Sequence, residues 1–382
     1  METRDMPEIR FENDYEEWKH RKLEDVAKFS TGECVTGSDC LLHGRFQIIG
    51  GGMLPMGYIN WKNRNKDTVT IAKIGSAGFV GWQKTDFFLT NNCFSVVPND
   101  EIDSEFLYHN LKQKETEIAR MKWQTSIPYI SVQSLGDLSV EFPSLPVQRE
   151  IADLFSSLDR KLAAEQKKLA ALKMAKHALL VKIFPREGET VPEIRFEGFS
   201  HPWEQRKLGD CFEERNENMP NGELISVTIN EGIKKFSELG RHDNSNEDKS
   251  KYKKVCVGDI AYNSMRMWQG ASGCSPYEGI VSPAYTVLKP KDGTDSKCVS
   301  YLFKRQDMVH TFQLNSQGIT SDNWNLKFPA LSQIEIKLPP EIDEQKKIAA
   351  YFTDLDRLIT LHQRKCDKLR QAKSALLNQM FV

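Results

Sequence analysis

The sequence contains an internal repeat, and this repeat limits the possible architecture more than any other feature. Residues 7–25, PEIRFENDYEEWKHRKLED, recur as residues 192–210, PEIRFEGFSHPWEQRKLGD, with 11 of 19 positions identical. A second block, residues 148–184, recurs as residues 345–381 with 16 of 37 positions identical. The offsets are 185 and 197 residues, so the segment between the blocks is twelve residues longer in the second copy. A unit of front block, middle segment and second block is therefore present twice.

The middle segments, residues 30–147 and 215–344, share an order of predicted elements but few side chains. Strands with Gly turns are predicted at 68–82 and 87–98, followed by a helix at 103–122; the second copy has strands at 259–273 and 279–290 and a helix at 296–312. An enzyme that acts twice would be expected to repeat its reactive residues. Constant frames around variable inserts instead favour two binding modules with different targets.

Apolar residues in the two second blocks recur at alternating steps of four and three, without Pro or Gly to interrupt them. Each block is expected to form a helix of about 37 residues, roughly 55 Å long. So narrow a stripe favours an antiparallel pair of the two helices, with one domain at each end; the alternative is two surface helices, each packed on its own domain. The apolar seam positions are Ile151, Phe155, Leu158, Leu162, Leu169, Leu172 and Leu179, and in the second copy Ile348, Phe352, Leu355, Ile359, Leu369 and Leu376.

Polar residues interrupt this seam at matching places in the two copies. Glu165 and His362 are expected in one layer, and Lys176 and Lys373 in another. Polar residues in the middle of a seam typically fix the register of a helix pair at some cost in stability.

Composition excludes several classes of protein. No apolar run could span a bilayer and the segment METRDMPEIR lacks the apolar core of a signal peptide, so a soluble, cytoplasmic protein is expected. The eight cysteines are scattered, which predicts reduced thiols and neither a zinc site nor a disulfide frame. A formal net charge of -1 argues against a protein that coats nucleic acid by bulk basicity, so any nucleic-acid surface must be local.

Motifs of several enzyme classes are missing. There is no G-x-x-x-x-G-K-[ST] phosphate loop, no N-P-P-[YF] element of adenine methyltransferases and no repeated acidic cluster typical of metal nucleases. The glycines of IIGGGMLPMG, residues 48–57, lack the frame of a dinucleotide site and are interpreted as a turn. We therefore expect no catalytic residue, no metal site and no cofactor bound by this chain.

Four motifs together resemble the specificity subunit of Type I restriction-modification systems over essentially the whole chain. They are WEQRKLGD at 203–210 with its echo WKHRKLED at 18–25, and EQKKIAAYFTDLD at 344–356 with its echo QREIADLFSSLD at 148–159. The chain departs from the pattern of this family in two minor ways. Cys366 occupies a seam position where an apolar residue is more usual. The first helical block opens with Pro146 and Val147, where the second has Asp343 and Glu344.

This resemblance implies an α+β protein with two tandem α/β target-recognition domains separated by two long antiparallel helices in a coiled coil, related by an internal pseudo-two-fold repeat. The expected boundaries are residues 1–146 and 186–342 for the domains, and 147–185 and 343–382 for the spacer helices. Each domain would read one half of an interrupted, asymmetric double-stranded DNA sequence. The implied partners are two modification subunits, which bring S-adenosylmethionine and methylate adenine, and restriction subunits, which bring ATP and Mg.

Two other classes of protein compete with this interpretation. A purely structural scaffold, in which the helices dimerise and the middle segments bind protein, predicts no salt-sensitive DNA affinity in any complex. A solitary modifying enzyme with fused recognition domains would need a methyl-donor motif, which the sequence lacks.

A protein reads a DNA sequence with side chains that carry forked donors or amides and reach the base edges in a groove. Phosphate contacts position these side chains but carry no sequence information. In the second domain, candidates of both kinds are present. The candidates between two predicted strands are Asn263, Arg266, Trp268 and Gln269. Alternatively, Trp268 lies in the core and Arg266 forms a salt bridge. A basic run predicted near phosphate comprises Lys249, Lys251, Lys253 and Lys254, and a polar loop after the predicted helix comprises Asn315, Ser316, Gln317, Thr320 and Asn323.

In the first domain the predicted DNA contacts fall into three groups. Lys73, Ser76, Gln83 and Lys84 are predicted contacts in or beside the strands, and Lys62, Arg64 and Lys66 are predicted backbone contacts. The counterpart of the polar loop comprises Gln124, Thr125 and Ser126, which follow the predicted contacts Arg120 and Lys122. Trp18 and Trp203 belong to the constant frame and are predicted to pack each domain onto the helices.

Overall fold

The structure is a computed structural model of the 382-residue chain. It describes residues 6–12, 14, 16–123, 127–229, 232–240, 242–243, 245–320 and 323–381. The chain divides into two compact units, which we call unit 1 (Met1–Lys167 with Gln363–Val382) and unit 2 (Lys168–His362). Each unit contains one of the middle segments and a part of each long helix.

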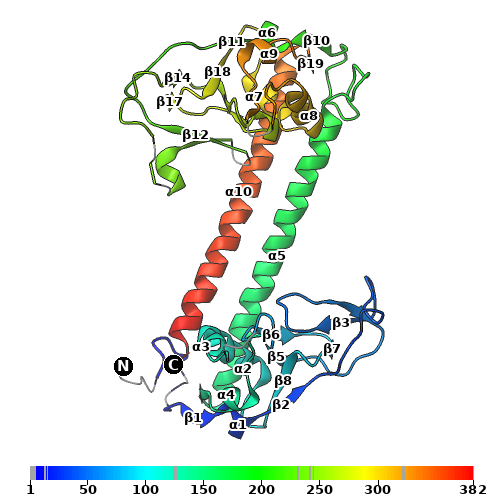
Figure 1. The fold of residues 1–382 in the computed structure, drawn as a ribbon, viewed down its shortest axis with the longest axis vertical. Coiled ribbons are helices and arrows are strands. Elements are labelled where there is room, and N and C mark those ends of the chain that lie inside the picture. The colour runs from blue at the N-terminus through cyan, green and yellow to red at the C-terminus, as the bar shows by residue number, and fades with distance from the viewer. Residues whose placement is uncertain are drawn as a thin grey trace. The chain divides into compact units, whose positions relative to one another are not determined.

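Unit 1 is built from strands and short helices that precede the first long helix (Figure 1). Its elements are β1 (Lys19–Lys22), α1 (Leu23–Val26), β2 (Ala27–Thr31), β3 (Phe46–Ile49), β4 (Gly57–Ile59), β5 (Thr68–Ala72), β6 (Val80–Gln83), β7 (Phe87–Leu89), β8 (Cys93–Pro98), α2 (Ser104–Gln113), α3 (Glu115–Arg120), α4 (Val132–Gly136) and β9 (Ser139–Phe142). The first long helix, α5, spans Leu145–Ile183.

Unit 2 follows the same plan, with other elements inserted. Its elements are β10 (Glu204–Lys207), α6 (Leu208–Cys211), β11 (Phe212–Glu214), β12 (Ile225–Thr228), β13 (Gly232–Lys235), the 3-10 helix η1 (Phe236–Leu239), β14 (Lys253–Val255), β15 (Ile260–Asn263), the 3-10 helix η2 (Met267–Gln269), β16 (Ser272–Cys274), β17 (Gly279–Val281), β18 (Tyr285–Pro290), α7 (Ser296–Leu302), α8 (Gln306–Leu314), α9 (Phe328–Leu331) and β19 (Glu335–Leu338). The second long helix, α10, spans Ile342–Gln379.

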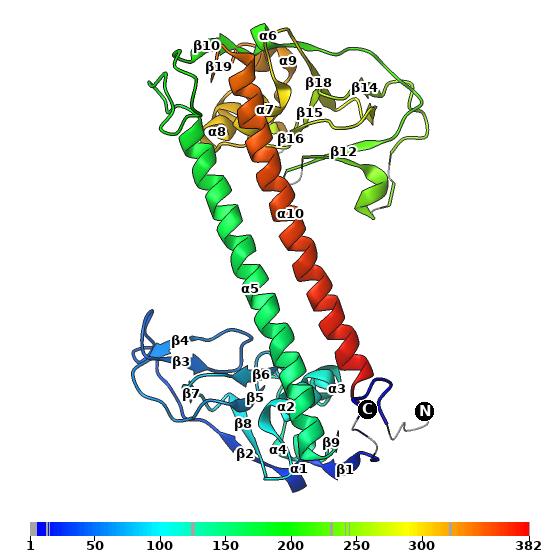
Figure 2. The ribbon, with the colours of Figure 1, turned by 180° about the vertical axis from the view of Figure 1, so that it is seen from behind.

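The main sheets of the two units have equivalent strand orders. Strands β2-β8-β5-β6 form an antiparallel sheet in unit 1, which can be followed in Figure 2, and β11-β18-β15-β16 form its counterpart in unit 2. The central strand β5, TVTIA, is buried along its whole length, which explains its unbroken run of apolar and β-branched residues. Smaller sheets flank each main sheet: β4-β3-β7 in unit 1, and β12-β13 and β14-β17 in unit 2.

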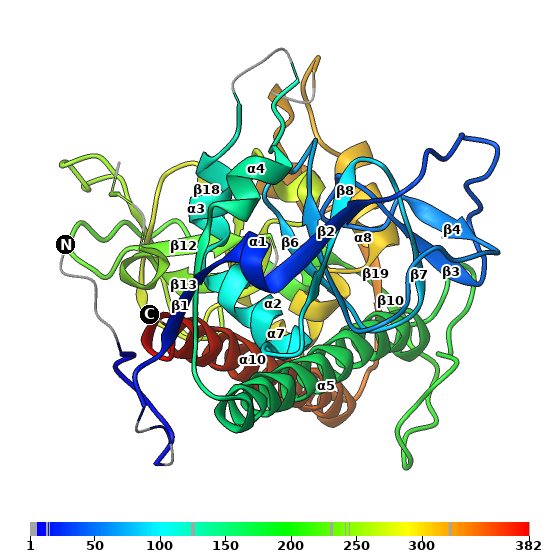
Figure 3. The same cartoon turned by 90° about the horizontal axis from the view of Figure 1, so that it is seen from below.

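The repeated front block closes each unit. Strand β1 pairs antiparallel with β9, and β10 pairs in the same way with β19, just before each long helix begins. Figure 3 shows α1 between β1 and β2, where the chain passes from this pair into the main sheet. The Trp18 ring packs edge-on against Phe381 at 6.3 Å, and Trp203 packs edge-on against Phe184 at 5.8 Å. Both aromatic partners lie just beyond the end of a long helix, which confirms that the two tryptophans pack the domains onto the helices.

A repeated glutamine joins each long helix to the helix that follows the main sheet. Gln148 Oε1 accepts the backbone N–H of Asp103, and Gln345 Oε1 accepts that of Asp295, both at 2.8 Å. The two aspartates cap α2 and α7, because their carboxylates accept N–H groups of the first helical turn. The beginning of the repeated second block therefore sets the position of the same element in both units.

Where a unit contains parts of both long helices, those parts run antiparallel. In unit 1 the Phe155 ring lies 6.0 Å from Phe381, and Asp159 accepts from Lys373 at 2.6 Å. In unit 2 the Phe184 ring stacks on Phe352 at 6.4 Å, and Asp356 accepts from Lys176 at 2.6 Å. Every apolar seam position predicted from the heptad pattern is buried or half-buried.

The predicted layer shared by Lys176 and Lys373 is wrong. Each lysine forms an ion pair with an aspartate of the other helix within its own unit. Antiparallel packing places repeat-equivalent residues at different positions along the pair, and an aspartate compensates the lysine charge where a second lysine would repel it. The register is therefore marked by a Lys–Asp pair that occurs twice.

The single helices predicted after the strands are each two helices. In unit 1 the chain breaks at Lys114 between α2 and α3, and in unit 2 residues 303–305 separate α7 from α8. Arg305 has an extended backbone, and its guanidinium donates to the Pro185 carbonyl at 3.1 Å and pairs with Asp307. Such long-range contacts override a helical pattern that is read from local periodicity.

Candidate nucleic-acid interface

Two loops meet at one end of the main sheet in each unit. The first, which we call the sheet loop, joins the central strand to the edge strand: residues 73–79 in unit 1 and 264–271 in unit 2. The second, which we call the helix loop, follows the helix after the sheet: residues 121–123 and 127–131 in unit 1, and 315–320 and 323–327 in unit 2. Ile130 N–H donates to the Lys73 carbonyl at 3.0 Å, and Leu326 N–H donates to the Ser264 carbonyl at 2.9 Å. The same pair of loops is therefore joined in the same way twice.

Each helix loop also folds back on itself. Trp123 N–H donates to the Tyr129 carbonyl at 2.9 Å, and Gln317 N–H donates to the Asn325 carbonyl at 3.0 Å. In unit 1, Gly78 of the sheet loop lies so close to α3 that a Cβ there would meet the Ala119 Cα at 2.7 Å. The loops are thus supported by the sheet on one side and by a helix on the other.

The sheet loop of unit 2 holds the residues predicted to read bases. Arg266 is exposed, and its guanidinium has no ion-pair or hydrogen-bond partner among the described residues. The alternative of a salt-bridged Arg266 is therefore not seen there. Trp268 is half-buried: its ring packs edge-on against Trp324 of the helix loop at 5.4 Å, and its Nε1–H donates to the Met265 carbonyl at 3.1 Å. Trp268 joins the two loops, and Arg266 is free to reach outward.

The neighbouring amides have different environments. Asn263 Oδ1 accepts the N–H of Met265 at 3.0 Å and so shapes the start of the sheet loop. Gln269 is half-buried, and its Oε1 has no partner among the described residues. A buried acceptor without a donor is costly, and this oxygen is not presented at the surface of the sheet loop.

The other predicted residues of unit 2 divide into free and occupied groups. Lys253 and Lys254 lie in β14 and pair with Glu214 at 3.2 Å and Glu217 at 3.4 Å, while Lys251 is exposed and Lys249 half-buried just before this strand. In the helix loop, the following residues are exposed apart from the half-buried Ser316: Asn315, Ser316, Gln317, Thr320 and Asn323. The helix loop is joined to the sheet loop by the hydrogen bond from Leu326 to Ser264.

In unit 1, four predicted residues lie at the paired loops. Lys73 and Ser76 are half-buried in the sheet loop, Arg120 is exposed at the end of α3, and Lys122 is half-buried in the helix loop. The Lys73 ammonium lies over the Phe94 ring at 5.8 Å. The predicted contacts Gln124, Thr125 and Ser126 lie outside the described residues.

The three residues of unit 1 that are predicted to contact the DNA backbone lie away from the sheet loop and the helix loop. Lys62, Arg64 and Lys66 precede β5, at the opposite end of that strand from the sheet loop. Lys62 pairs with Asp86 at 2.6 Å, and the Arg64 guanidinium donates to four acceptors, among them the Thr31 carbonyl at 2.7 Å. The geometry of Arg64 gives no support to a phosphate contact, because its donors are used within the sheet.

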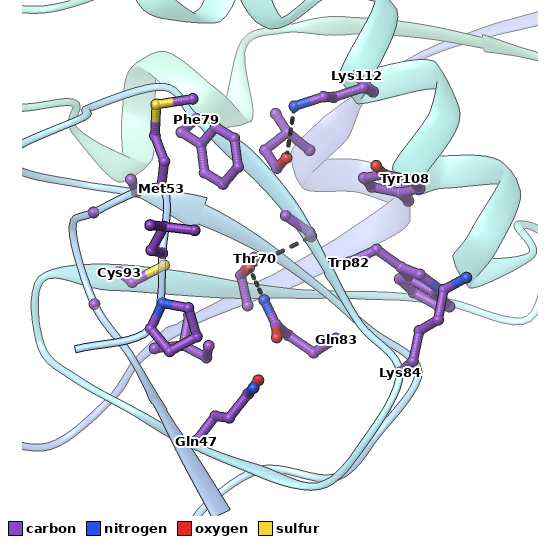
Figure 4. Close-up of a pocket in the computed structure, with 18 of the residues that line it drawn as sticks. Gln47, Met53, Thr70, Phe79, Trp82, Gln83, Lys84, Cys93, Tyr108 and Lys112 are labelled. Carbon is purple, nitrogen blue, oxygen red and sulfur yellow. Dashed lines mark hydrogen bonds between the residues drawn. The ribbon is translucent and has the colours of Figure 1, made fainter. Parts of the chain in front are cut away.

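Gln83 and Lys84 line a groove of about 560 Å³ in unit 1 (Figure 4). Gln83 Nε2 donates to Thr70 Oγ1 at 3.1 Å, and the Trp82 ring stacks on Tyr108 at 5.9 Å. Lys84 is exposed at the edge of the groove. The groove runs along β6, which begins where the sheet loop ends.

Four exposed apolar side chains at the helix loops were missed by the sequence analysis. Trp123 and Ile127 are 57% and 62% exposed in unit 1, and Leu314 and Ile319 are 71% and 99% exposed in unit 2. The signal available in the sequence was two apolar residues within or directly before each polar loop.

The described residues show neither a metal site nor a disulfide nor a membrane-spanning helix. None of the described His, Cys, Asp and Glu side chains gather in a group of three that could hold a metal ion. All eight cysteines lie in described segments and are free of disulfides. In the part of the chain that the structure describes, no helix has the length and apolarity needed to cross a membrane.

Comparisons with known proteins agree with this duplicated design. The family profile described as Type I restriction modification DNA specificity domain matches residues 15–174 and again residues 200–371. A putative type I specificity subunit of Mycoplasma pneumoniae is 22% identical over 95% of this chain and 96% of its own length. Another, of Mycoplasma genitalium, is 27% identical over 45% of this chain and 46% of its own, so the match spans about half of that relative.

A solved structure extends the likeness to the fold. The S subunit of a Type I restriction-modification system from M. genitalium superimposes with a TM-score of 0.70 at 17% identity, over 99% of each chain. Because the profile matches most of the sequence in two copies, the chain belongs to the Type I restriction-modification DNA specificity family. The chain thus contains two copies of this specificity domain and two long helices.

Proposed function

We propose that each unit reads one half of a bipartite, asymmetric DNA site through its sheet loop and helix loop. The observation that carries this proposal is the duplicated joining of the two loops, by Ile130 to Lys73 and by Leu326 to Ser264, with different side chains on each copy. Equivalent backbones with different side chains are what two readers of different base sequences require.

The side chains of unit 2 suit contacts in the major groove. Arg266 is exposed and free of protein partners among the described residues, and a guanidinium can donate two hydrogen bonds to a guanine edge. Gln269 lies three residues after Arg266 in the same loop, and its amide would pair with adenine only after its buried oxygen turns outward. The exposed lysine Lys251 is suited to a phosphate contact, which adds affinity without sequence information.

The chain acts, in this proposal, as the non-catalytic part of a larger complex. Two modification subunits would bring S-adenosylmethionine, and restriction subunits would bring ATP and Mg, so this chain itself binds no cofactor. Membership of the specificity family supports these partners, and the sequence lacks the methyltransferase and phosphate-loop motifs that it would need to act alone.

The purified chain should therefore transfer no methyl group to DNA. Incubation with double-stranded DNA and radiolabelled S-adenosylmethionine should leave the DNA unlabelled, while addition of the modification subunit should start labelling. Methyl transfer by the chain alone would contradict a non-catalytic role.

Arg266→Ala should weaken discrimination at one base pair by about 1–3 kcal/mol, because the lost bidentate contact distinguishes one base from the others. The measurement is methylome sequencing of cells that carry the variant and its modification partner. Arg186→Ala, an exposed arginine that pairs with Glu193 outside the loops, is the matched control and should leave base preference unchanged. A uniform loss over all sequences would make Arg266 a phosphate contact, and unchanged modification would remove it from the interface.

A further inference from the structure

One lysine occupies the same place in both units. Lys112 and Lys304 each lie nine residues after the aspartate that caps the helix following the main sheet, Asp103 or Asp295. Each sends its ammonium to the backbone at the first residue of the edge strand, where the sheet loop ends. The sheet loop of each unit therefore has a third point of attachment, in addition to the strand before it and the helix loop beside it.

The contacts of Lys304 use its full donor capacity. Its Nζ donates to the carbonyls of Gly270 at 2.8 Å, Ser272 at 2.8 Å and Ile229 at 3.0 Å. An ammonium has three N–H donors, so none remains for a phosphate. Burial lowers the pKa of Lys304 to about 8, and the group still carries its charge at neutral pH. The Lys304 ammonium is thus held by hydrogen bonds within the protein and is not a DNA contact.

Lys112 makes the corresponding hydrogen bonds in unit 1. Its Nζ donates to the Val80 carbonyl at 3.1 Å, the bond drawn beside the groove in Figure 4, and to Glu115 Oε1 at 2.6 Å. The same carboxylate oxygen accepts the Val80 N–H at 2.8 Å, so both polar groups of this peptide are held. The Lys112 ammonium also lies 4.4 Å from the centre of the Phe79 ring, the last residue of the sheet loop.

These hydrogen bonds lie at the end of each sheet loop, where the loop would otherwise be free to move. Gly270 has a left-handed backbone, with φ of 78°, directly after η2, and Arg266 to Gln269 lie between it and the strand. A charge-assisted bond to the Gly270 carbonyl fixes the turn that orients these side chains. A displacement of the loop by about 1 Å is enough to lose a bidentate base contact.

We propose that Lys304, and Lys112 in the other unit, are positioning residues that hold each sheet loop in the geometry that selects bases. This inference rests on the proposed function, because it assigns the sheet loops to base reading. It predicts that each lysine governs one half-site, that of its own unit.

The test replaces Lys304 by methionine, which keeps the length of the side chain and removes its donors. Amide hydrogen exchange in residues 264–271 of the full chain should accelerate by about tenfold or more. In cells with the modification partner, base preference should relax by about tenfold at one half-site and remain intact at the other. Lys112→Met should relax the opposite half-site, and Lys304→Arg, which retains a charged donor, should restore much of the preference.

The matched control is Lys289→Met, an exposed lysine of unit 2 that pairs with Glu213 on the neighbouring strand at 2.7 Å. It should change neither exchange nor preference. Unchanged exchange in the sheet loop of the Lys304 variant, or an equal loss at both half-sites, would overturn the inference. If Lys304→Met does not fold, Lys112→Met decides by the same two readouts. Faster exchange after Lys304→Met, combined with no effect of Arg266→Ala on modification, would identify the proposed function as the failing part.

Discussion

Phe352→Ala should lower the free energy of unfolding by about 3–5 kcal/mol, because it removes a fully buried ring and leaves a cavity. The Phe352 ring lies 6.4 Å from Phe184 and 5.1 Å from Tyr301, so it joins both long helices to α7 within unit 2. Its exposed fraction is zero. The loss should be measured by urea unfolding of the purified chain, followed by fluorescence and circular dichroism.

Leu358→Ala is the matched control on the same helix. Leu358 is 39% exposed, so its truncation should cost well under the loss at Phe352. Phe155→Ala tests the repeat, because the Phe155 ring lies 4.6 Å from His109 and 6.0 Å from Phe381 in unit 1. A cost below about 1 kcal/mol at Phe352 would mean that the aromatic cluster does not anchor the helices.

The seam could be predicted from the sequence because a periodic pattern depends on the helix itself. Residues such as Phe155 and Phe352 recur at steps that only a helix with one partner face explains, and both are fully buried. The same reasoning paired Lys176 with Lys373, which was wrong, because the pattern contains no information on which residue lies opposite. Their aspartate partners, Asp159 and Asp356, are repeated in the sequence and could have indicated the pairing.

The candidate site was predicted less completely, because it depends on contacts between distant segments. Arg266 could be found from its type and its place between two strands, and the structure leaves it exposed. Arg64, predicted from the sequence as a contact to the DNA backbone, is instead used within the sheet. Lys304 looked like any lysine near a helix end, since its three carbonyl partners come from residues at least 32 positions away. Such contacts are invisible to local pattern.

The glycines at residues 50–52 show how a correct local prediction can miss a long-range role. The sequence predicts a turn at these glycines, and the structure places them in a loop that follows β3. Gly51 is packed directly against the sheet loop of unit 1: its carbonyl accepts the N–H of Ser76 at 2.7 Å. A Cβ at Gly51 would lie 2.1 Å from the Ile74 carbonyl oxygen. The turn therefore supports the loop that contains Lys73 and Ser76.

Gly51→Ala should cost about 3 kcal/mol or more of unfolding free energy, at the upper end of overpacking, because the clash is with backbone that cannot rotate away. Gly52→Ala is the matched control: its nearest neighbour, the Leu54 carbonyl oxygen, would lie at 3.4 Å, an ordinary contact. Thermal unfolding of the two variants gives the comparison directly.

The same pair of variants separates stability from recognition. Movement of Ile74 to relieve the clash must displace the sheet loop of unit 1, while the loop of unit 2 has no contact with Gly51 among the described hydrogen bonds. At a temperature where both variants remain folded, the methylation motif made with Gly51→Ala should become degenerate in one half and stay intact in the other. Gly52→Ala should leave both halves unchanged. Loss of both halves in folded Gly51→Ala, or a motif identical to that of the unaltered chain, would mean that this loop does not set the base preference of unit 1.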